Sequence, residues 1–287
     1  MTVVYQKEIK TYRYSLLSYL LIAGFLLFIG IYTMALNLSN GLPNFEYALN
    51  GGLMMMLIFI PVLTMSILAN ERRNRTDRLL YGSVIPMRGI VMGKFLAAFT
   101  VFMIPVLLFC FYPLILASYG RVHFISAYTG ILALIFLGAA LIAIGIFVSS
   151  LTDSQSVAAV CTFGSLLLSW MMPTLYGYIS SSPRTSFIGW LMVLALLCLA
   201  LYANRKQLFL PLCIFAVGGT ALSVLFIAAP HLFSGTIKTF LSYFALFSPF
   251  EVFVYGLVKL PSLVYYASVT VLFLFFSARS MERRESA

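Results

Sequence analysis

The sequence has very few charged residues for its length. Only 9% of its 287 residues are Asp, Glu, Lys or Arg, whereas 62% are apolar or aromatic. A typical soluble domain carries about 25% charged and about 45–50% apolar residues. So few polar side chains cannot cover the surface of a water-soluble fold. The composition therefore excludes a soluble globular enzyme and a disordered tail, and it predicts an all-α polytopic membrane protein.

Residues that build disulfide frameworks and metal sites are also scarce. His123 and His231 are the only histidines, and they lie in different loops with no carboxylate nearby in the sequence. A zinc site needs more ligands than this, so we predict no metal site. The four cysteines lie within apolar runs and form no C-x-x-C pair, which indicates small buried apolar side chains. They are Cys110, Cys161, Cys198 and Cys213.

Catalytic patterns are missing as well. The stretch from Gly89 to Lys94, followed by Phe95, is one residue short of a phosphate-binding P-loop and lacks its hydroxyl. Carboxylates are few, and Glu251 stands among aromatic residues without a partner in sequence. We therefore predict no catalytic residue and no cofactor held by this chain. Any energy for transport must come from a partner or an ion gradient.

Long apolar runs dominate what is present. A bilayer core needs about 20 apolar residues in a helix, and eight runs approach or exceed that length, the sixth being the shortest. They are 15–36, 50–69, 95–118, 128–150, 156–178, 186–202, 208–229 and 262–279. With the N-terminus inside, 14 of the 18 Lys and Arg fall in inside loops. The positive-inside rule then predicts cytoplasmic termini in a multi-pass inner-membrane protein, and the basic charge needs no nucleic acid to explain it.

The chain is interpreted as one membrane domain over 1–287, with several segments outside the spans. Residues 1–14 mix tyrosines with basic residues, which fits either an interfacial amphipathic helix or a basic topogenic tail. Residues 70–94 form a cytoplasmic loop and 149–155 a short inside turn. The external segment 230–261 is rich in Phe and Tyr, and we expect it to form helices at the outer interface.

The loop 70–94 carries the strongest local signal. Its first half predicts a short polar helix ending in Leu79-Leu80, and Tyr81 to Ser83 break that helix. A second helix is expected to start at Pro86 and to run through Lys94 into the third span. An exposed leucine pair between charges suits docking into a groove on a cytoplasmic partner. The alternative is a topology loop whose leucines rest on the membrane surface.

Three blocks of sequence carry a family resemblance. The first comprises Thr64, Met65, Ala69, Glu71, Arg73, Thr76, Leu79, Leu80, Pro86, Val91 and Gly93 to Ala98. The second comprises Gly138 to Gly145, Ser149 to Asp153, Gln155, Ala158 and Ala159, and the third comprises Phe250, Glu251, Phe253, Gly256, Tyr265 and Tyr266. Together they resemble the membrane subunit, or permease, of ABC transporters of the type 2 exporter class, especially the gliding-motility-associated branch.

The chain departs from that family in two places. Arg75 stands where Gly is usual, and Asp77 and Arg78 replace the usual residues before the leucine pair. The family usually has six spans, so 186–229 is interpreted as an inserted two-span hairpin. These departures put the choice of partner in doubt more than the role.

The resemblance implies an ATP-driven exporter in which two membrane subunits, either two copies or this chain with a related permease, join two cytoplasmic ATPase subunits. ATP and Mg would be bound by the ATPase. The loop 70–94 would be the coupling segment, and the turn at 152–155 a second contact. The implied ATPase contacts are Glu71, Arg72, Arg73, Thr76, Leu79, Leu80, Pro86, Thr152, Asp153 and Gln155.

The substrate path of such an exporter would lie between the two membrane subunits. The fifth span carries four hydroxyl side chains in its sequence, Ser156, Thr162, Ser165 and Ser169. They would line the path or bond to neighbouring helices. Two other classes stay open: an ion-driven secondary carrier, and a non-transport scaffold or intramembrane enzyme. The lack of charged residues near the centres of the spans disfavours the carrier and the enzyme.

Overall fold

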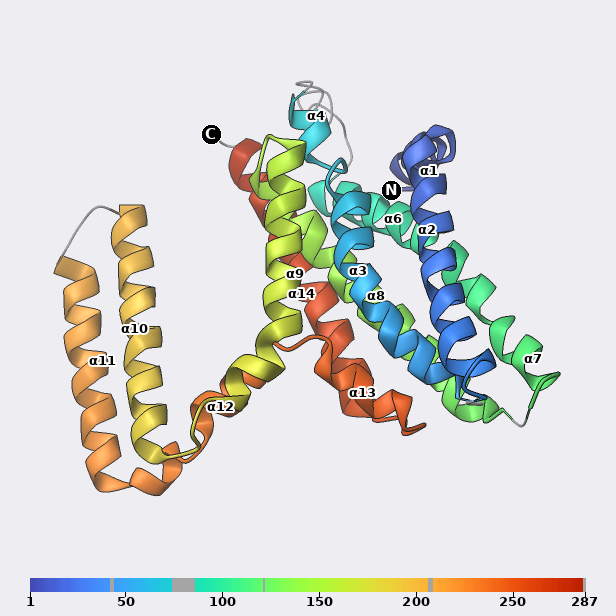
Figure 1. The fold of residues 1–287 in the computed structure, drawn as a ribbon. Helices are drawn as coiled ribbons and strands as arrows, with labels where there is room; N and C mark the ends of the chain where they lie inside the picture. The colour runs from blue at the N-terminus through green and yellow to red at the C-terminus, as the bar shows by residue number, and fades with distance from the viewer. Residues whose placement is uncertain (42–43, 74–85, 121, 206–208, 286–287) are drawn as a thin grey trace. The chain divides into compact units, whose positions relative to one another are not determined.

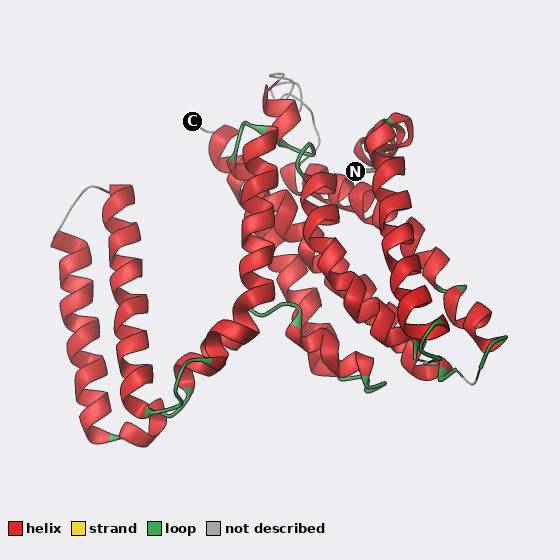
Figure 2. Ribbon diagram, viewed as in Figure 1, coloured by secondary structure: helices red, strands yellow, loops and turns green. Residues whose placement is uncertain are grey.

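The computed structural model describes residues 1–41, 44–73, 86–120, 122–205 and 209–285. Every regular element within these ranges is a helix, and none of them contains a strand (Figure 2). The prediction of an all-α fold is therefore confirmed. The helix that the sequence predicts from Pro86 and Met87 through Lys94 is present as α6 (Met87–Phe109), with Pro86 as its N-cap.

The elements follow one another as a series of helices joined by short connections (Figure 1). They are α1 (Thr2–Tyr14), α2 (Leu16–Tyr32), the π-helix η1 (Thr33–Leu38), α3 (Phe45–Thr64), α4 (Ala69–Arg73), α6, α7 (Tyr112–Ala117), α8 (Phe124–Leu151), α9 (Gln155–Gly177), α10 (Pro183–Arg205), α11 (Phe209–Ala228), the 3₁₀ helix η2 (Pro230–Phe233), α12 (Thr236–Ser242), α13 (Ser248–Val254) and α14 (Leu260–Glu285).

Seven helical segments within the described ranges are long and apolar enough to cross a membrane. They are Leu16–Leu38, Phe45–Glu71, Met87–Ala117, Phe124–Leu151, Gln155–Gly177, Pro211–Ala228 and Leu260–Arg283. The remaining predicted span, the sixth run 186–202, corresponds to α10, whose apolar part, Pro183–Leu199, is shorter than the others. The structure therefore supports a multi-pass helical protein with seven candidate spans, and the count of eight is not confirmed.

The chain divides into two compact units. The first contains Met1–Leu168 and Leu246–Ala287, and the second contains Ser169–Ala245. In the first unit α8 is the central helix and packs against α3, α6, α13 and α14. Aromatic side chains fill the space between the helices. Phe25 lies 5.1 Å from Phe59 and 5.2 Å from Phe109 between ring centroids.

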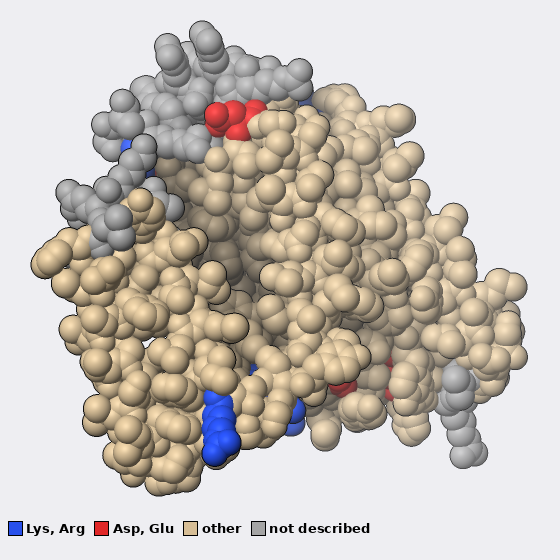
Figure 3. Space-filling view, turned by 60° about the vertical axis from the view of Figure 1, so that its left-hand side comes forward, with Lys and Arg blue, Asp and Glu red and all other residues tan. Residues whose placement is uncertain are grey.

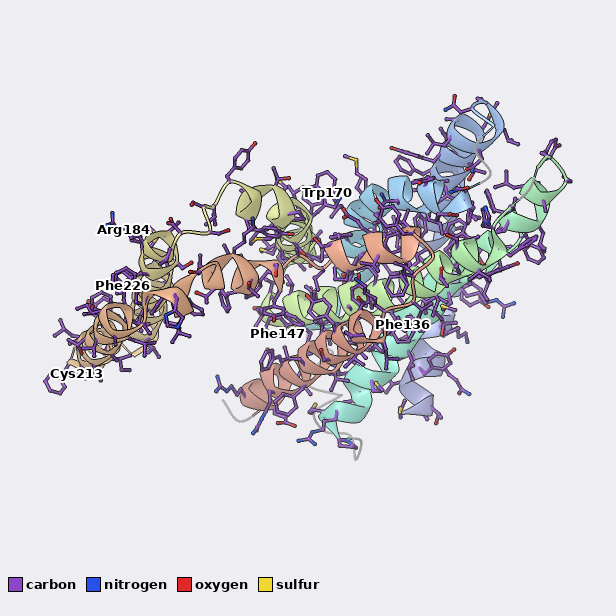
Figure 4. All side chains as sticks on the ribbon, turned by 90° about the horizontal axis from the view of Figure 1, so that it is seen from below. Phe136, Phe147, Trp170, Arg184, Cys213 and Phe226 are labelled. Carbon is purple, nitrogen blue, oxygen red and sulfur yellow. The ribbon has the colours of Figure 1, made fainter. Side chains whose placement is uncertain are left out.

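Close approach of α3 and α8 depends on a glycine. A Cβ atom on Gly145 would overlap the side chain of Thr64, so the two helices touch where α8 has no side chain. Near the same end of α8, Phe147, labelled in Figure 4, packs against Phe273 and Phe276 of α14. Small residues at crossings allow membrane helices to pack by van der Waals contact. The resulting core holds α3, α8 and α14 in fixed register.

The second unit consists of a helical hairpin and the short helices that follow it. Figure 1 shows α10 and α11 side by side, and they contact each other along their lengths. Phe187 stacks on Phe226, labelled in Figure 4, with 4.7 Å between ring centroids. Trp190 Nε1 donates to Thr236 Oγ1 at 3.1 Å. Residues 186–229, predicted as an inserted hairpin, thus form two adjacent helices.

Only a few charged side chains appear on the face shown in Figure 3. This agrees with a protein surrounded by lipid. The prediction that all four cysteines are buried is wrong: Cys198 is buried and Cys110 half-buried, but Cys161 and Cys213 are exposed. A membrane helix has no need to bury an apolar side chain, because lipid tails solvate it equally well.

The segments outside the spans are also helical where the structure describes them. Residues 2–14 form α1, which packs against α6, and the segment 230–261 contains η2, α12 and α13. Residues 2–14 are thus helical, which was one of the two alternatives for the N-terminal segment. The positions of both segments at the membrane surface stay predictions.

Candidate functional site

A buried lysine at the end of the loop 70–94 connects three helices, one of which contains the first residues of that loop. Lys94 lies two turns into α6, and its side chain is 1% exposed. Its Nζ donates to Glu8 Oε1 of α1 and to the carbonyl of Ile67, each at 2.8 Å. The same Nζ lies 2.8 Å from Glu71 Oε2 of α4. We call Lys94, Glu8 and Glu71 the lysine cluster.

The lysine cluster satisfies an ammonium group that would otherwise be costly to bury. An ammonium has three protons. It donates to the Glu8 carboxylate and to the Ile67 carbonyl, and the Glu71 carboxylate pairs with the same ammonium by charge. The carboxylate side chains are 13% and 14% exposed, so water screens these pairs poorly. Breaking a buried pair by removing one partner leaves an uncompensated charge. The cluster therefore ties α1, α4 and α6 together.

Ser149, near the end of α8, binds the backbone at the start of α4. Its Oγ accepts from the backbone N–H of Leu68 at 3.3 Å and of Ala69 at 3.2 Å. It also lies 3.4 Å from the carbonyl of Met65. The first amides of a helix have no partner within the helix, so Ser149 caps the beginning of α4. The end of α8 is thereby attached to the beginning of the loop.

Helix α1 has further contacts with the first unit. The Tyr12 hydroxyl donates to the Leu63 carbonyl at 3.1 Å, and Tyr5 shares a hydrogen bond with Thr100 at 3.2 Å. Burial, and next the negative charge of Glu8, raise the pKa of the Tyr12 phenol well above its ordinary value. Tyr12 therefore remains a neutral donor at physiological pH. An open cavity of about 250 Å³ lies beside these contacts and is lined by residues of α1, α2, α3 and α4.

Glycine permits the close approach of α1 to α6. A Cβ on Gly93 would lie 3.1 Å from the Met1 carbonyl oxygen and 3.2 Å from Val4 Cβ. These distances are shorter than ordinary van der Waals contact, so any larger residue would push α1 outward. Gly93, next to Lys94, is therefore small because α1 packs directly on it. The sequence alone does not reveal this contact.

The predicted coupling residues have different positions. Glu71 belongs to the lysine cluster, Arg72 and Arg73 complete α4, and Pro86 is exposed at the start of α6. Thr76, Leu79 and Leu80 lie outside the described residues, and so does the short polar helix predicted for them. Glu71 thus points toward Lys94 and Lys7 within this chain, where the sequence predicted a contact with a partner.

The second predicted contact is the turn between α8 and α9. Asp153 is exposed, Thr152 and Gln155 are half-exposed, and Thr152 Oγ1 bonds to the Ser154 carbonyl at 3.4 Å. The turn starts three residues after Ser149. The capping bonds of Ser149 therefore bring this turn close to α4. The two predicted partner contacts would then lie near each other.

The four hydroxyl side chains of α9 do not form one polar face. Ser156 is exposed, while Ser165 donates to the Thr162 carbonyl of its own helix at 2.8 Å. Ser169 donates to the Phe244 carbonyl at 2.7 Å. Thr162 is buried. Of these two bonds, only that of Ser169 leaves α9, so the choice between lining a path and bonding to neighbouring helices stays open.

Sequence comparison identifies the family. The family model described as ABC-2 family transporter protein matches residues 27–202, more than half of the chain. The chain belongs to the ABC-2 transporter family. No curated protein and no solved structure gave a match. The matched range includes the first two resemblance blocks, and Thr64 of the first contacts Gly145 of the second.

Membership makes this ABC-2 transporter protein a multi-pass membrane permease, as the apolar helices independently indicate. Within the part of the chain that is described, no three His, Cys, Asp or Glu residues gather as metal ligands would. The lysine cluster offers no nucleophile and no acid–base pair directed at a ligand. Its role is structural. The ion pairs of the cluster connect α4 with α1 and α6, and the capping bonds of Ser149 connect α4 with α8.

Proposed function

We propose that this ABC-2 permease is the membrane subunit of an ATP-driven exporter of the inner membrane and that a separate ATPase docks on its loop 70–94. The resemblance of the three sequence blocks supports the gliding-motility-associated branch as part of this proposal. Permeases of this family generally pair with cytoplasmic ATPase subunits. ATP and Mg would be bound by that ATPase, and a second permease copy or a related permease would complete the path.

The observation that carries this proposal is the lysine cluster with its neighbour Ser149. A loop that merely crossed between two spans would need no buried ion pairs at its beginning. Here Glu71 is paired with Lys94, and the first amides of α4 are capped by α8. A force applied to the loop would therefore reach α1, α6 and α8 as one body. Such a connection is what transmission from an ATPase to membrane helices requires.

The loop residues beyond α4 would provide the contact itself. Leu79 and Leu80 would anchor in the groove of the ATPase while the surrounding arginines steer its approach. The turn at Thr152 to Gln155 would form the smaller second contact.

The experiment that tests the proposal is affinity purification of the tagged chain from native membranes in mild detergent, followed by mass spectrometry. We expect a stoichiometric ATPase subunit with the wild-type chain and its loss with Leu79→Asp/Leu80→Asp. The matched control is Leu257→Asp/Val258→Asp, which changes two exposed apolar residues that follow α13. This control should retain the ATPase. The same detergent extract must yield other ABC complexes intact.

Two results would overturn the proposal. One is a leucine-pair variant that still assembles with the ATPase and transports normally. The other is purified wild-type chain that moves substrate in liposomes without any ATPase, which would identify an ion-driven carrier. If the wild-type chain is always isolated alone, a non-transport scaffold becomes the better assignment.

A further inference from the structure

A second polar site lies at the other end of α3. An open pocket of about 380 Å³ is formed by the start of α3, the start of α8 and the turn that ends α13. Its lining residues include Glu46, Tyr47, His123, Ser126 and Tyr255. Glu46 is the second residue of α3 and Glu71 ends the same candidate span, so this pocket and the lysine cluster lie at opposite ends of that span. The charge distribution predicts that the pocket faces outside.

Glu46 is the unusual residue of this pocket. It is 2% exposed, and one of its carboxylate oxygens, Oε1, accepts from Ser126 Oγ at 2.8 Å. The other oxygen, Oε2, is buried and has no hydrogen-bond partner among the described residues. A carboxylate has about four lone-pair positions for donors, and the site provides one. Buried polar atoms in native structures nearly always have a partner.

The surrounding structure does not compensate the charge. Ser126 has a single hydroxyl proton, and its contact with Glu46 is shorter than its 3.4 Å contact with the Val254 carbonyl. The start of α3 attracts a negative charge, but that attraction is small beside the cost of burying a carboxylate. Within the described residues, neither Lys nor Arg pairs with Glu46 or lines the pocket. A cationic donor from outside the described residues would supply the missing partner.

The shape of the pocket depends on Gly256. Its φ is +71°, a conformation that side chains rarely adopt, and a Cβ there would lie 3.2 Å from Ser126 Oγ. The turn after α13 can therefore approach α8 closely enough to form a wall of the pocket. Tyr47 and Tyr255 are exposed on the lining and offer aromatic faces to a cation. Residues from three distant parts of the sequence thus surround one buried carboxylate.

We propose that this pocket binds a primary ammonium group, with Glu46 as its counter-charge. An ammonium donates three hydrogen bonds, so in this pocket it can pair with the Glu46 carboxylate and also contact the tyrosine rings. Two sources provide this group at the end of a membrane span: the headgroup of phosphatidylethanolamine and a free soluble amine. The site is independent of the proposed ATPase contact, because its residues lie at the opposite end of α3.

The test uses the full-length permease in nanodiscs, without any ATPase, with its melting temperature as the readout. One series compares discs of phosphatidylglycerol with discs that also contain phosphatidylethanolamine. The other adds ethanolamine hydrochloride to phosphatidylglycerol discs, with choline chloride, sodium chloride and magnesium chloride at matched ionic strength. A melting temperature raised by phosphatidylethanolamine identifies the lipid source, and one raised by ethanolamine identifies the soluble source.

The variants decide whether Glu46 is responsible. In Glu46→Gln, we expect the ammonium concentration for a half-maximal shift to rise at least tenfold. Glu251→Gln is the matched control, because Glu251 is exposed on α13 outside the pocket, and it should bind as the wild type does. Should Glu46→Gln not fold, His123→Lys adds a cation to an exposed lining position and should weaken binding similarly.

Three results would overturn the proposal. They are an absence of any shift with both ammonium sources, equal shifts in Glu46→Gln and the wild type, and equal shifts with choline or the inorganic salts. None of them bears on whether an ATPase docks on the loop 70–94, because no ATPase is present. Conversely, a permease that fails to bind an ATPase can still show this binding site.

Discussion

Lys94 Nζ lies 2.8 Å from Glu71 Oε2, although Glu71 belongs to α4 and Lys94 to α6, at the two ends of the loop 70–94. The pair closes that loop at its base, since Glu71 ends one candidate span and Lys94 lies near the beginning of the next. Glu8 completes the arrangement from α1. Any displacement of α4 therefore acts on α1 and α6 through these ion pairs.

Replacing the buried lysine should damage both stability and coupling. In Lys94→Met the carboxylates of Glu8 and Glu71 lose their common cation, which costs about 3–5 kcal/mol for a buried pair. We expect a lower melting temperature in mild detergent and weaker stimulation of the partner ATPase. Lys7→Met is the control: Lys7 is 61% exposed and lies 3.4 Å from Glu71. It should cost less than about 1 kcal/mol. Equal melting temperatures for the two variants would contradict this account of the lysine cluster.

Two adjacent serines allow a bond between helices to be compared with a bond within one helix. Ser149→Ala leaves the amides of Leu68 and Ala69 without their acceptor in a buried place, at a cost of about 1–3 kcal/mol. Ser150→Ala removes only a bond to the Phe147 carbonyl of its own helix. Both serines are fully buried, so the pair is matched in environment. We expect thermal melting to show the larger loss in Ser149→Ala, and a greater loss in Ser150→Ala would argue against capping.

Much of the architecture could be predicted from apolar runs, because the bilayer imposes a minimum length on every span. The predicted spans 50–69 and 128–150 start later than α3 and α8, since these helices continue beyond the apolar core into polar sequence. The helix around Lys94 is predicted to start at Pro86, and α6 starts at Met87. A buried lysine two turns inside a helix needs a carboxylate partner, but the sequence does not say which one.

The sequence could not predict which residues meet in the two polar sites. Glu8, Glu71 and Lys94 meet only because α1 folds back onto α6, and Glu46 meets Ser126 only through the packing of α3 on α8. Neither contact follows from spacing along the chain. The docking role of Thr76, Leu79 and Leu80 lies outside the described residues and stays a prediction.

Alkaline pH should loosen α1 through Tyr12. Its pKa is raised in the folded protein by burial, and next by Glu8, above the ordinary value of 10.0. A raised pKa in the folded state means that the unfolded state loses this proton first. The stabilisation is therefore complete below pH 10 and declines as pH rises, by about 1.4 kcal/mol per pH unit. Melting temperatures between pH 9 and 12 should fall less steeply for Tyr12→Phe than for the wild type. Tyr14→Phe, which changes an exposed tyrosine of the same helix, should retain the wild-type slope.

The contact between Gly145 and Thr64 should tolerate no added atom. In Gly145→Ala the new methyl group overlaps the Thr64 side chain, so α3 and α8 must separate or Thr64 must change its rotamer. Overpacking of this kind costs about 1–3 kcal/mol. Gly24→Ala provides the control, because a Cβ there would meet only Met55 Cε at an ordinary 3.6 Å. We expect the melting temperature to fall clearly in the first variant and to be unchanged or raised in the second, since alanine favours a helix more than glycine does. A wild-type melting temperature for Gly145→Ala would mean that the two helices do not cross at this position.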